Sequence, residues 1–203
     1  MSWYMGAARK VPKMPMTPRQ RVLGQHHAEM EQLKTESSIL EFTATGKPPD
    51  KYRIIFHGKC LVAGPAGEPV LGDRQEIEIS LGMEYPRSMP HVKWLTEIVH
   101  PNIFNNGVCF GNFASRWTAY FHLTDMAEIL WDYSRLAILN PLSAGPGAGN
   151  HRLTYEQLDK KFNFPVDRRP LRDKLVGKND GSSAVRPAGE QQDIVILDDP
   201  EKC

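Results

Sequence analysis

The sequence HPNIFNNGVC, residues 100–109, combines a turn-forming segment with one cysteine. Cys109 lies two residues after the turn-forming segment Asn105-Asn106-Gly107, and Asn102 lies seven residues before that cysteine. A thiol beside an amide donor, held on a loop between regular elements, suits covalent acyl transfer. The alternative is that Cys109 is a small buried apolar residue, as free cysteines often are. The sequence on either side of this segment has to decide between the two interpretations.

The composition of the chain is that of an ordinary globular protein. Its 203 residues are 40% hydrophobic and 24% charged, enough for one domain with tails or for two small domains at most. The formal net charge of +1 requires neither a nucleic-acid partner nor a highly acidic one. Since there is no apolar run of about 20 residues and no signal-peptide pattern at the N-terminus, we expect a cytoplasmic protein without a membrane partner.

The three cysteines, Cys60, Cys109 and Cys203, are widely spaced and odd in number. They form no C-x-x-C pair, so neither a structural zinc site nor a disulfide framework is expected. We therefore expect free thiols, no metal and no cofactor. Cys60 lies within a strand pattern, which predicts a packed and inert thiol.

The first half of the chain predicts one helix followed by a sheet. After a flexible arm over residues 1–16, Thr17-Pro18-Arg19-Gln20 has a capping residue, a proline at the first helical position and the capping-box spacing, which predicts a helix to about Lys34. Alternating apolar residues then predict four strands, at residues 39–45, 52–62 with a break at Gly58, 77–81 and 92–96. Four consecutive strands with short connections indicate an antiparallel meander.

The second half predicts mainly helices. An irregular segment follows Cys109, and a core helix then runs from Leu123 to about Leu139, with Thr124 as its capping candidate. A capping box at Thr154 begins another helix, which continues through about Phe162. A further short helix is expected after residue 170.

The last segment, residues 173–203, is expected to be a flexible tail with a short apolar and acidic segment at 193–199. Four apolar residues in that segment are able to add as a strand to the sheet edge of a partner protein: Ile194, Val195, Ile196 and Leu197. An intramolecular edge strand and an unused tail are the alternatives.

The order of these elements resembles the ubiquitin-conjugating enzyme fold, and several motifs support the resemblance in the family's own order. They are Tyr85-Pro86 with Pro90 and Trp94, then His100-Pro101-Asn102, Gly107-Val108-Cys109, Trp117 and Asn140-Pro141. The resemblance covers about Thr17 to Phe162. It implies an α+β domain over residues 17–172, in which a four-stranded antiparallel meander packs on a central helix, with N- and C-terminal helices beside it.

By this resemblance the chain is an acyltransferase. Cys109 would accept the carboxyl terminus of ubiquitin or a ubiquitin-like protein from an activating enzyme as a thioester, and would pass it to an amine of an acceptor protein, usually a lysine. Asn102 would donate to the developing oxyanion or order the loop. His100 would order the turn that presents Asn102, and Trp117 and Asn140 would be supporting residues.

Two other functions remain open at this point. The first is a non-catalytic module that binds a ubiquitin-like protein on the same fold. The second is a cysteine hydrolase, which would need a base such as His122 or His151 beside Cys109.

The chain also departs from the family's pattern. The spacing from His100 to Cys109 is one residue shorter than in many members, and Trp117-Thr118-Ala119-Tyr120 stands where Trp-x-Pro is usual. Arg87 stands where ligase-binding members often have an aromatic residue, so a conventional RING-type ligase is not expected as a partner. Asn140 stands near a position that is acidic in the family, and an asparagine cannot carry a full negative charge. By analogy, these departures resemble the conjugating proteins of bacterial ubiquitin-like operons, which act in phage defence.

Overall fold

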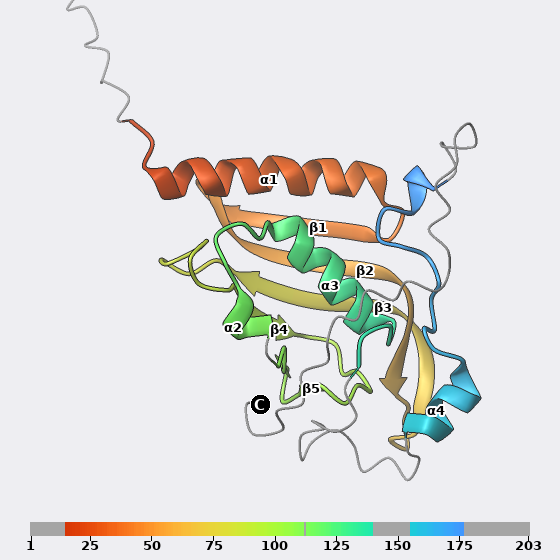
Figure 1. Cartoon of the computed structure of the whole chain (residues 1–203). Coiled ribbons are helices and arrows are strands. Elements are labelled where there is room, and N and C mark those ends of the chain that lie inside the picture. Colours follow the sequence, from red (N-terminus) through yellow and green to blue (C-terminus); the bar gives the residue numbers. More distant parts are fainter. Residues whose placement is uncertain (1–14, 112, 140–154, 177–203) are drawn as a thin grey trace, which may run out of the picture.

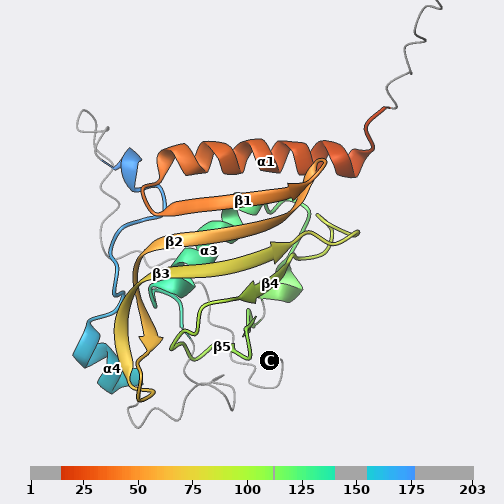
Figure 2. The ribbon, with the colours of Figure 1, turned by 180° about the vertical axis from the view of Figure 1, so that it is seen from behind.

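The computed structural model describes residues 15–111, 113–139 and 155–176. A four-stranded antiparallel sheet is formed by β1 (Leu40–Gly46), β2 (Pro49–Ala63), β3 (Pro69–Ser80) and β4 (His91–Trp94), in the order of the sequence. The helices α1 (Pro18–Glu36) and α3 (Leu123–Ser134) lie against it (Figure 1). Seen from behind, the strands lie in front of α3, which packs across the opposite face of the sheet (Figure 2). The predicted α+β meander is confirmed.

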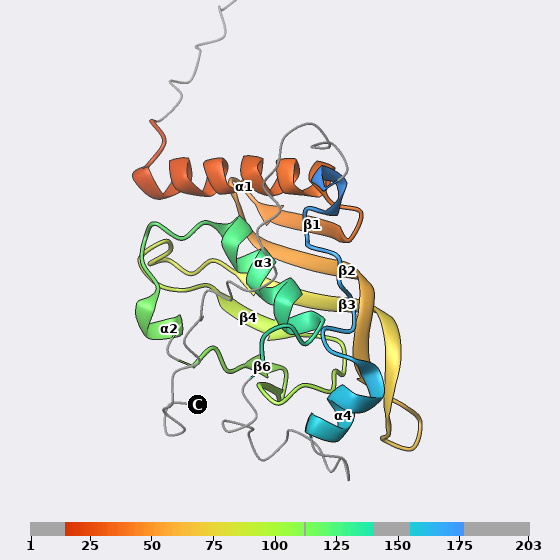
Figure 3. The ribbon, with the colours of Figure 1, turned by 45° about the vertical axis from the view of Figure 1, so that its right-hand side comes forward.

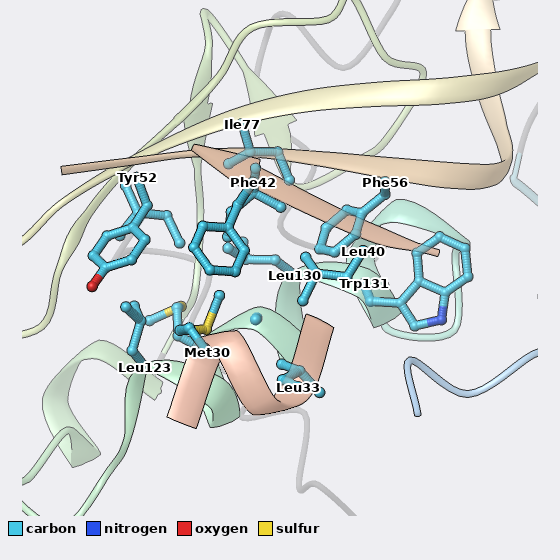
Figure 4. Packing of buried hydrophobic residues seen from close by; sticks show 14 of the residues in the cluster. Met30, Leu33, Leu40, Phe42, Tyr52, Phe56, Ile77, Leu123, Leu130 and Trp131 are labelled. Carbon is cyan, nitrogen blue, oxygen red and sulfur yellow. The ribbon is translucent and has the colours of Figure 1, made fainter. Parts of the chain in front are cut away.

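The core lies between this sheet and the two helices. Alternate residues of β2 point inward, and Tyr52, Ile54 and Phe56 are almost completely buried. In Figure 4 Tyr52 and Phe56 face the helices, from which Met30 and Leu33 of α1 and Leu130 and Trp131 of α3 point toward the sheet. Burying a side chain of this size contributes about 1.5–3 kcal/mol, so the apolar alternation that predicted the strands also fixes which face of the sheet the helices cover.

Two strands are longer than the sequence predicted. β3 begins at Pro69 rather than at Ile77, within the segment that the sequence assigned to a connection, and β2 is continuous. The sequence indicated a break at Gly58, whereas β2 passes through this residue with an irregular register between His57 and Cys60. A bulge lets a strand bend without ending. A Cβ atom at Gly58 would lie 2.3 Å from Cη2 of Trp131. Glycine here therefore allows the indole ring of α3 to touch the backbone of the strand.

The start of α1 is as predicted. The Gln20 backbone N–H donates to Oγ1 of Thr17 at 3.2 Å, and the Thr17 backbone N–H donates to Oε1 of Gln20 at 2.8 Å. These reciprocal bonds satisfy donors that a helix otherwise leaves without partners. The helix continues to Glu36, two residues beyond the predicted end.

Both ends of α3 differ from the prediction. His122, not Thr124, is the N-cap residue, and its backbone N–H donates to Oδ2 of Asp125 at 2.8 Å. Thr124 is a buried residue of the first turn. The helix ends at Ser134 rather than near Leu139, because Leu136 has a left-handed φ of 61°. The apolar periodicity continues beyond the helix because Leu136 is buried in a second apolar cluster, with Leu61, Val99, Leu158 and Val166.

The remaining elements are short. A hairpin of β5 (Ile103–Phe104) and β6 (Gly107–Val108) is followed by the four-residue helix α2 (Phe113–Arg116), which the sequence did not indicate. The predicted C-terminal helices are present as α4 (Tyr155–Phe162), beside the end of β2 and β3 in Figure 3, and as the 3-10 helix Asp173–Leu175. No helix in the described part of the chain is long and apolar enough to cross a membrane.

The segment after α4 is bonded to β2, to α3 and to the connection between α1 and β1. The indole N–H of Trp131 donates to the Arg169 carbonyl at 2.8 Å, and the Lys59 backbone N–H donates to Oδ2 of Asp167 at 3.0 Å. At its end, the Ser38 backbone N–H donates to Oδ1 of Asp173 at 2.7 Å. Arg169 beside Asp167 lowers the pKa of that carboxyl to about 2, although its partial burial acts in the opposite direction.

Candidate functional site

A tight hairpin places Cys109 at the surface. Asn105 and Asn106 connect β5 to β6 with φ of 50° and 64°, and Phe104 pairs with Gly107 across them. Two central residues with positive φ are the signature of a type I′ turn, in which asparagine is favoured. The carbonyl of Asn106 also accepts the Trp94 backbone N–H at 2.8 Å, which fixes the hairpin to β4. Cys109 is the first residue after this hairpin.

The backbone of Cys109 is bonded on both sides. Its N–H donates to the Asn102 carbonyl at 2.7 Å, and its own carbonyl accepts the hydroxyl of Tyr133 at 3.3 Å. Tyr133 belongs to α3, so the loop is joined to the central helix. The periodicity of the sequence assigned Tyr133 only to the core. Its burial raises the pKa of the phenol to about 12, so it remains a donor at neutral pH.

Cys60 and Cys109 differ in their burial. Cys60 is free and buried, as expected, and burial raises the pKa of its thiol. Cys109 is only partly buried, at the end of the hairpin.

His100 is a neutral and buried residue of the loop, with both ring nitrogens in use. Its Nδ1 accepts the Asn102 backbone N–H at 3.0 Å, and its Nε2 therefore carries the proton that is shared with the Ile138 carbonyl at 3.0 Å. Burial lowers the pKa of His100 to about 3. A histidine bonded in this way fixes the turn at Asn102, and it has no nitrogen available to accept a proton from Cys109.

Trp117 joins two loops. Its indole N–H donates to the Pro86 carbonyl at 2.8 Å, and its ring stacks on Phe121 with a centroid distance of 5.2 Å. Phe113 contacts both of these rings edge-on, and the ring of Tyr85 lies 6.4 Å from that of Trp117. Trp117 is largely buried, so the loop that begins at Tyr85 and the loop before α3 are held together by aromatic packing.

An open cleft of about 310 Å³ lies beside Cys109. Its lining is mostly apolar or small: Met89, Phe104, Gly107, Val108, Cys109, Phe110, Gly111 and Ala114. An open, largely apolar cleft of this kind suits an extended peptide with small side chains rather than a charged small molecule.

The structure brings Cys109, Asn102 and His100 together, and Trp117 lies in the neighbouring loop. Asn140, His151 and Ile194–Leu197 lie outside the described residues. His122 bonds to Glu29 through Nδ1 at 2.7 Å and stacks on His26, so it is not arranged as a base for Cys109. Of the positions that depart from the family's pattern, Arg87 and Tyr120 are exposed.

The comparisons with known proteins agree with this architecture. Residues 27–164, more than half of the chain, match the family of ubiquitin-conjugating enzymes. Ubiquitin-conjugating enzyme E2 2 of Saccharomyces cerevisiae is 37% identical over 72 residues, 35% of this chain and 40% of that protein. Ubiquitin-conjugating enzyme E2 S of Branchiostoma floridae is 30% identical over 141 residues, 66% of this chain and 64% of that protein. The chain thus covers less than two thirds of the length of these relatives.

A solved structure shares the fold. A putative ubiquitin-conjugating enzyme from Plasmodium yoelii superposes with a TM-score of 0.53 at 16% identity, over 73% of this chain and 92% of the other. The match over residues 27–164 includes the segment around Cys109. The chain belongs to the ubiquitin-conjugating enzyme family.

Proposed function

We propose that this protein carries ubiquitin or a ubiquitin-like protein as a thioester on Cys109 and transfers it to an amine, usually of a lysine. The observation that supports this most directly is the position of Cys109, which follows a rigid hairpin, lies beside an apolar cleft and is bonded through its backbone to Asn102. Family membership supports ubiquitin-like conjugation in general. The thioester and the acceptor amine are the specific parts of the proposal.

The reaction has two acyl-transfer steps. In the first, the Cys109 thiolate attacks the thioester carbonyl that joins the modifier to the activating enzyme; a new S–C bond forms and the activating enzyme's thiolate leaves. In the second, an amine attacks the Cys109 thioester, loses a proton and forms an amide, and the Cys109 thiolate leaves. A thioester suits this role because thiolate is a strong nucleophile and also a good leaving group.

Asn102 is the proposed helper in the second step. Aminolysis places negative charge on the thioester oxygen, and the side-chain amide of Asn102 is the donor proposed to stabilise that charge. Removing one such donor typically lowers the rate about 100- to 1,000-fold. His100 has a positioning role in this proposal, since its Nδ1 accepts the backbone N–H of Asn102. Asn140 offers no carboxylate for the incoming amine, so the group that accepts the amine's proton is not assigned.

A cysteine hydrolase is less well supported by the described residues. Such an enzyme needs a base within reach of the thiol. Both nitrogens of His100 are bonded, and its low pKa means that the neutral ring does not take up a second proton at neutral pH. Cys109 itself argues against a purely non-catalytic binding module. Recruitment of a conventional RING-type ligase is not proposed, and the analogy to bacterial phage defence stays a prediction.

The test is a thioester assay. The protein is first reduced and freed of reductant, and it is then incubated with ubiquitin, the ubiquitin-activating enzyme and ATP. Wild type should form an adduct that a thiol reductant cleaves, and Cys109→Ser should form an adduct that resists it. Cys60→Ala is the matched control, because it removes a buried thiol and should leave a reducible adduct. A reducible adduct on Cys109→Ser, or none on wild type, would contradict the proposal.

The tail has a separate proposed role. Ile194–Leu197 lie outside the described residues, and their addition as a strand to the sheet of a partner rests on the sequence alone. The double variant Ile194→Asp with Ile196→Asp should weaken binding to ubiquitin, measured by a pull-down with immobilised ubiquitin. Unchanged binding by this variant would remove the proposal.

A further inference from the structure

Three side chains that are able to bind a metal meet between two helices, at a place with no part in the proposed thioester chemistry. His26 and Glu29 lie one turn apart on α1 and so face the same side of that helix. His122, the N-cap residue of α3, faces them from the other helix. One potential ligand atom from each residue lies within 4.8 Å of those of the other two.

The contacts within this cluster are close. Nδ1 of His122 and Oε2 of Glu29 are 2.7 Å apart. The imidazole rings of His26 and His122 stack with a centroid distance of 4.7 Å and an interplanar angle of 29°. Ring nitrogens and a carboxylate oxygen at one place are the kinds of ligand atom that a divalent cation of the zinc class binds.

A second set of residues holds two of these side chains in place. The hydroxyl of Tyr85 lies 2.6 Å from Nδ1 of His26, which leaves Nε2 of that ring for a ligand. Nε2 of Gln25 donates to Oε1 of Glu29 at 2.9 Å, which leaves Oε2. Metal-binding histidines and carboxylates are usually fixed by outer hydrogen bonds of this kind. An ordinary surface ion pair does not need them.

The cluster is buried at His26 and open to solvent at His122 and Glu29. His26 is only 3% exposed, whereas the side chains of His122 and Glu29 are 39% and 29% exposed. We propose that His26, Glu29 and His122 bind one divalent cation of the zinc class, with water as the remaining ligand. Two imidazoles and one carboxylate form a ligand set that zinc accepts, with an open fourth position.

Binding requires the ligands to rearrange. Zinc bonds to histidine nitrogen and carboxylate oxygen at about 2.0–2.2 Å, so two ligands at a tetrahedral angle lie about 3.4 Å apart. Nδ1 of His122 and Oε2 of Glu29, which are 2.7 Å apart, have to separate, and the ring of His122 has to turn out of its stack on His26 because an imidazole binds an ion that lies in its ring plane. Glu29 and His122 are partly exposed and supply this freedom, while His26 and Tyr85 remain in the core. Magnesium prefers oxygen ligands and is not expected to bind.

The bound metal would join α1 to the start of α3. The hydroxyl of Tyr85 reaches His26, and the ring of Tyr85 packs near Trp117, so the site also touches the loop that Trp117 holds. A ligand that binds only the folded state raises the stability of the protein by mass action. Zinc should therefore raise the unfolding temperature, a readout that is independent of any conjugation activity.

The experiment is a calorimetric titration of Zn²⁺ into the full chain near neutral pH, after reduction and alkylation of the cysteines so that thiols do not bind the metal. We expect saturable binding of one equivalent. Glu29→Gln and His122→Asn should each weaken it at least about tenfold, because loss of even an outer hydrogen-bond partner typically weakens metal binding by 10- to 100-fold. Both residues are partly exposed, and circular dichroism without metal checks the fold of each variant.

His57→Asn is the matched control. His57 forms a similar pair with Glu41, with Nε2 and Oε2 3.0 Å apart, on exposed strands and without a second histidine. This variant should bind Zn²⁺ as wild type does, and Mg²⁺ should give no heat of binding. The proposal is overturned if wild type binds no single equivalent, or if Glu29→Gln and His122→Asn lose less than tenfold. Equal loss in His57→Asn, or equal binding of Mg²⁺, would also overturn it.

Discussion

The backbone N–H of Cys109 donates to the carbonyl oxygen of Asn102 at 2.7 Å. This bond closes the loop that contains the Asn105–Asn106 turn, and it does not involve the side chain of either residue. The two groups proposed to act on the modifier are thus held at a fixed backbone separation. A change in the Asn102 side chain should therefore alter chemistry more than it alters the path of the loop.

Asn102→Ala is the variant that tests this separation of roles. It should still form the Cys109 thioester, while the discharge of that thioester to free lysine should slow about 100- to 1,000-fold, the usual cost of one lost oxyanion donor. The measurement is the single-turnover decay of the adduct after the activating enzyme has been stopped. Thermal unfolding of both proteins controls for damage to the loop. Discharge at the wild-type rate would show that Asn102 has no such role.

The neutral state of His100 makes stability depend on pH. Burial lowers the folded-state pKa to about 3, from about 6.5 in an unfolded chain, so between these values the unfolded state binds more protons. The free energy of unfolding should therefore fall as the pH decreases from 6.5 towards 4, by up to about 1.4 kcal/mol per pH unit from this residue. Urea unfolding at several pH values measures it.

His100→Gln is the comparison for that measurement. The variant should be less stable at neutral pH, but its stability should depend less steeply on pH between 6.5 and 4. Burial also lowers the pKa of His26. This residue therefore adds to the loss of stability at low pH, equally in wild type and in the variant. Asp167, with a pKa of about 2, loses its contribution only at lower pH. Equal slopes in wild type and variant would mean that His100 is not the titrating group.

Trp117 should be a strong determinant of stability. It is 8% exposed, packs between aromatic rings and donates to the Pro86 carbonyl. Trp117→Ala should lower the free energy of unfolding by about 3–5 kcal/mol. Tyr120 is three residues further along the same loop and 90% exposed, so Tyr120→Ala should change it by no more than about 0.5 kcal/mol. Denaturant unfolding of both variants checks this contrast, and a similar cost for the two would contradict the packing.

Two glycine substitutions should have opposite effects. A Cβ at Gly58 would lie 2.3 Å from Cη2 of Trp131 and 2.9 Å from Oδ2 of Asp167, so Gly58→Ala should destabilise the protein by about 1–3 kcal/mol or more. Gly24 lies within α1 and has no atom within 4 Å of such a Cβ. Gly24→Ala should stabilise by about 0.5–1 kcal/mol, since alanine favours the helix. Melting temperatures that move in the same direction would contradict this account.

The sequence predicted those parts of the fold that local patterns determine. Alternation identified the four strands, although not the first part of β3, and the capping box located the start of α1. The sequence-based prediction failed where contacts between residues far apart in the chain determine the local structure. His122 caps α3 although histidine is not a typical cap, and its side chain is held by Glu29 from another helix. Leu136 continues the helical period although the helix has ended, because this residue packs on Leu61 and Leu158 instead.

The site was predictable only in part for the same reason. The residues of the 100–109 segment are recognisable as a motif, and the Asn105–Asn106 turn follows from asparagine's tolerance of positive φ. The partners that fix them are not visible in the sequence. The Ile138 carbonyl that binds His100 and the Tyr133 hydroxyl that binds the Cys109 carbonyl both come from elements that the sequence assigned to a core helix alone.

The segment after α4 is bonded into the folded unit. The family match stops at residue 164, yet the indole N–H of Trp131, the Lys59 N–H and the Ser38 N–H find acceptors on Arg169, Asp167 and Asp173. A chain that stopped at Phe164 would leave these donors to water or without a partner, at about 1–3 kcal/mol for each one that stays buried. We therefore expect a stable protein to need the chain at least through Asp173, beyond the boundary of the family match.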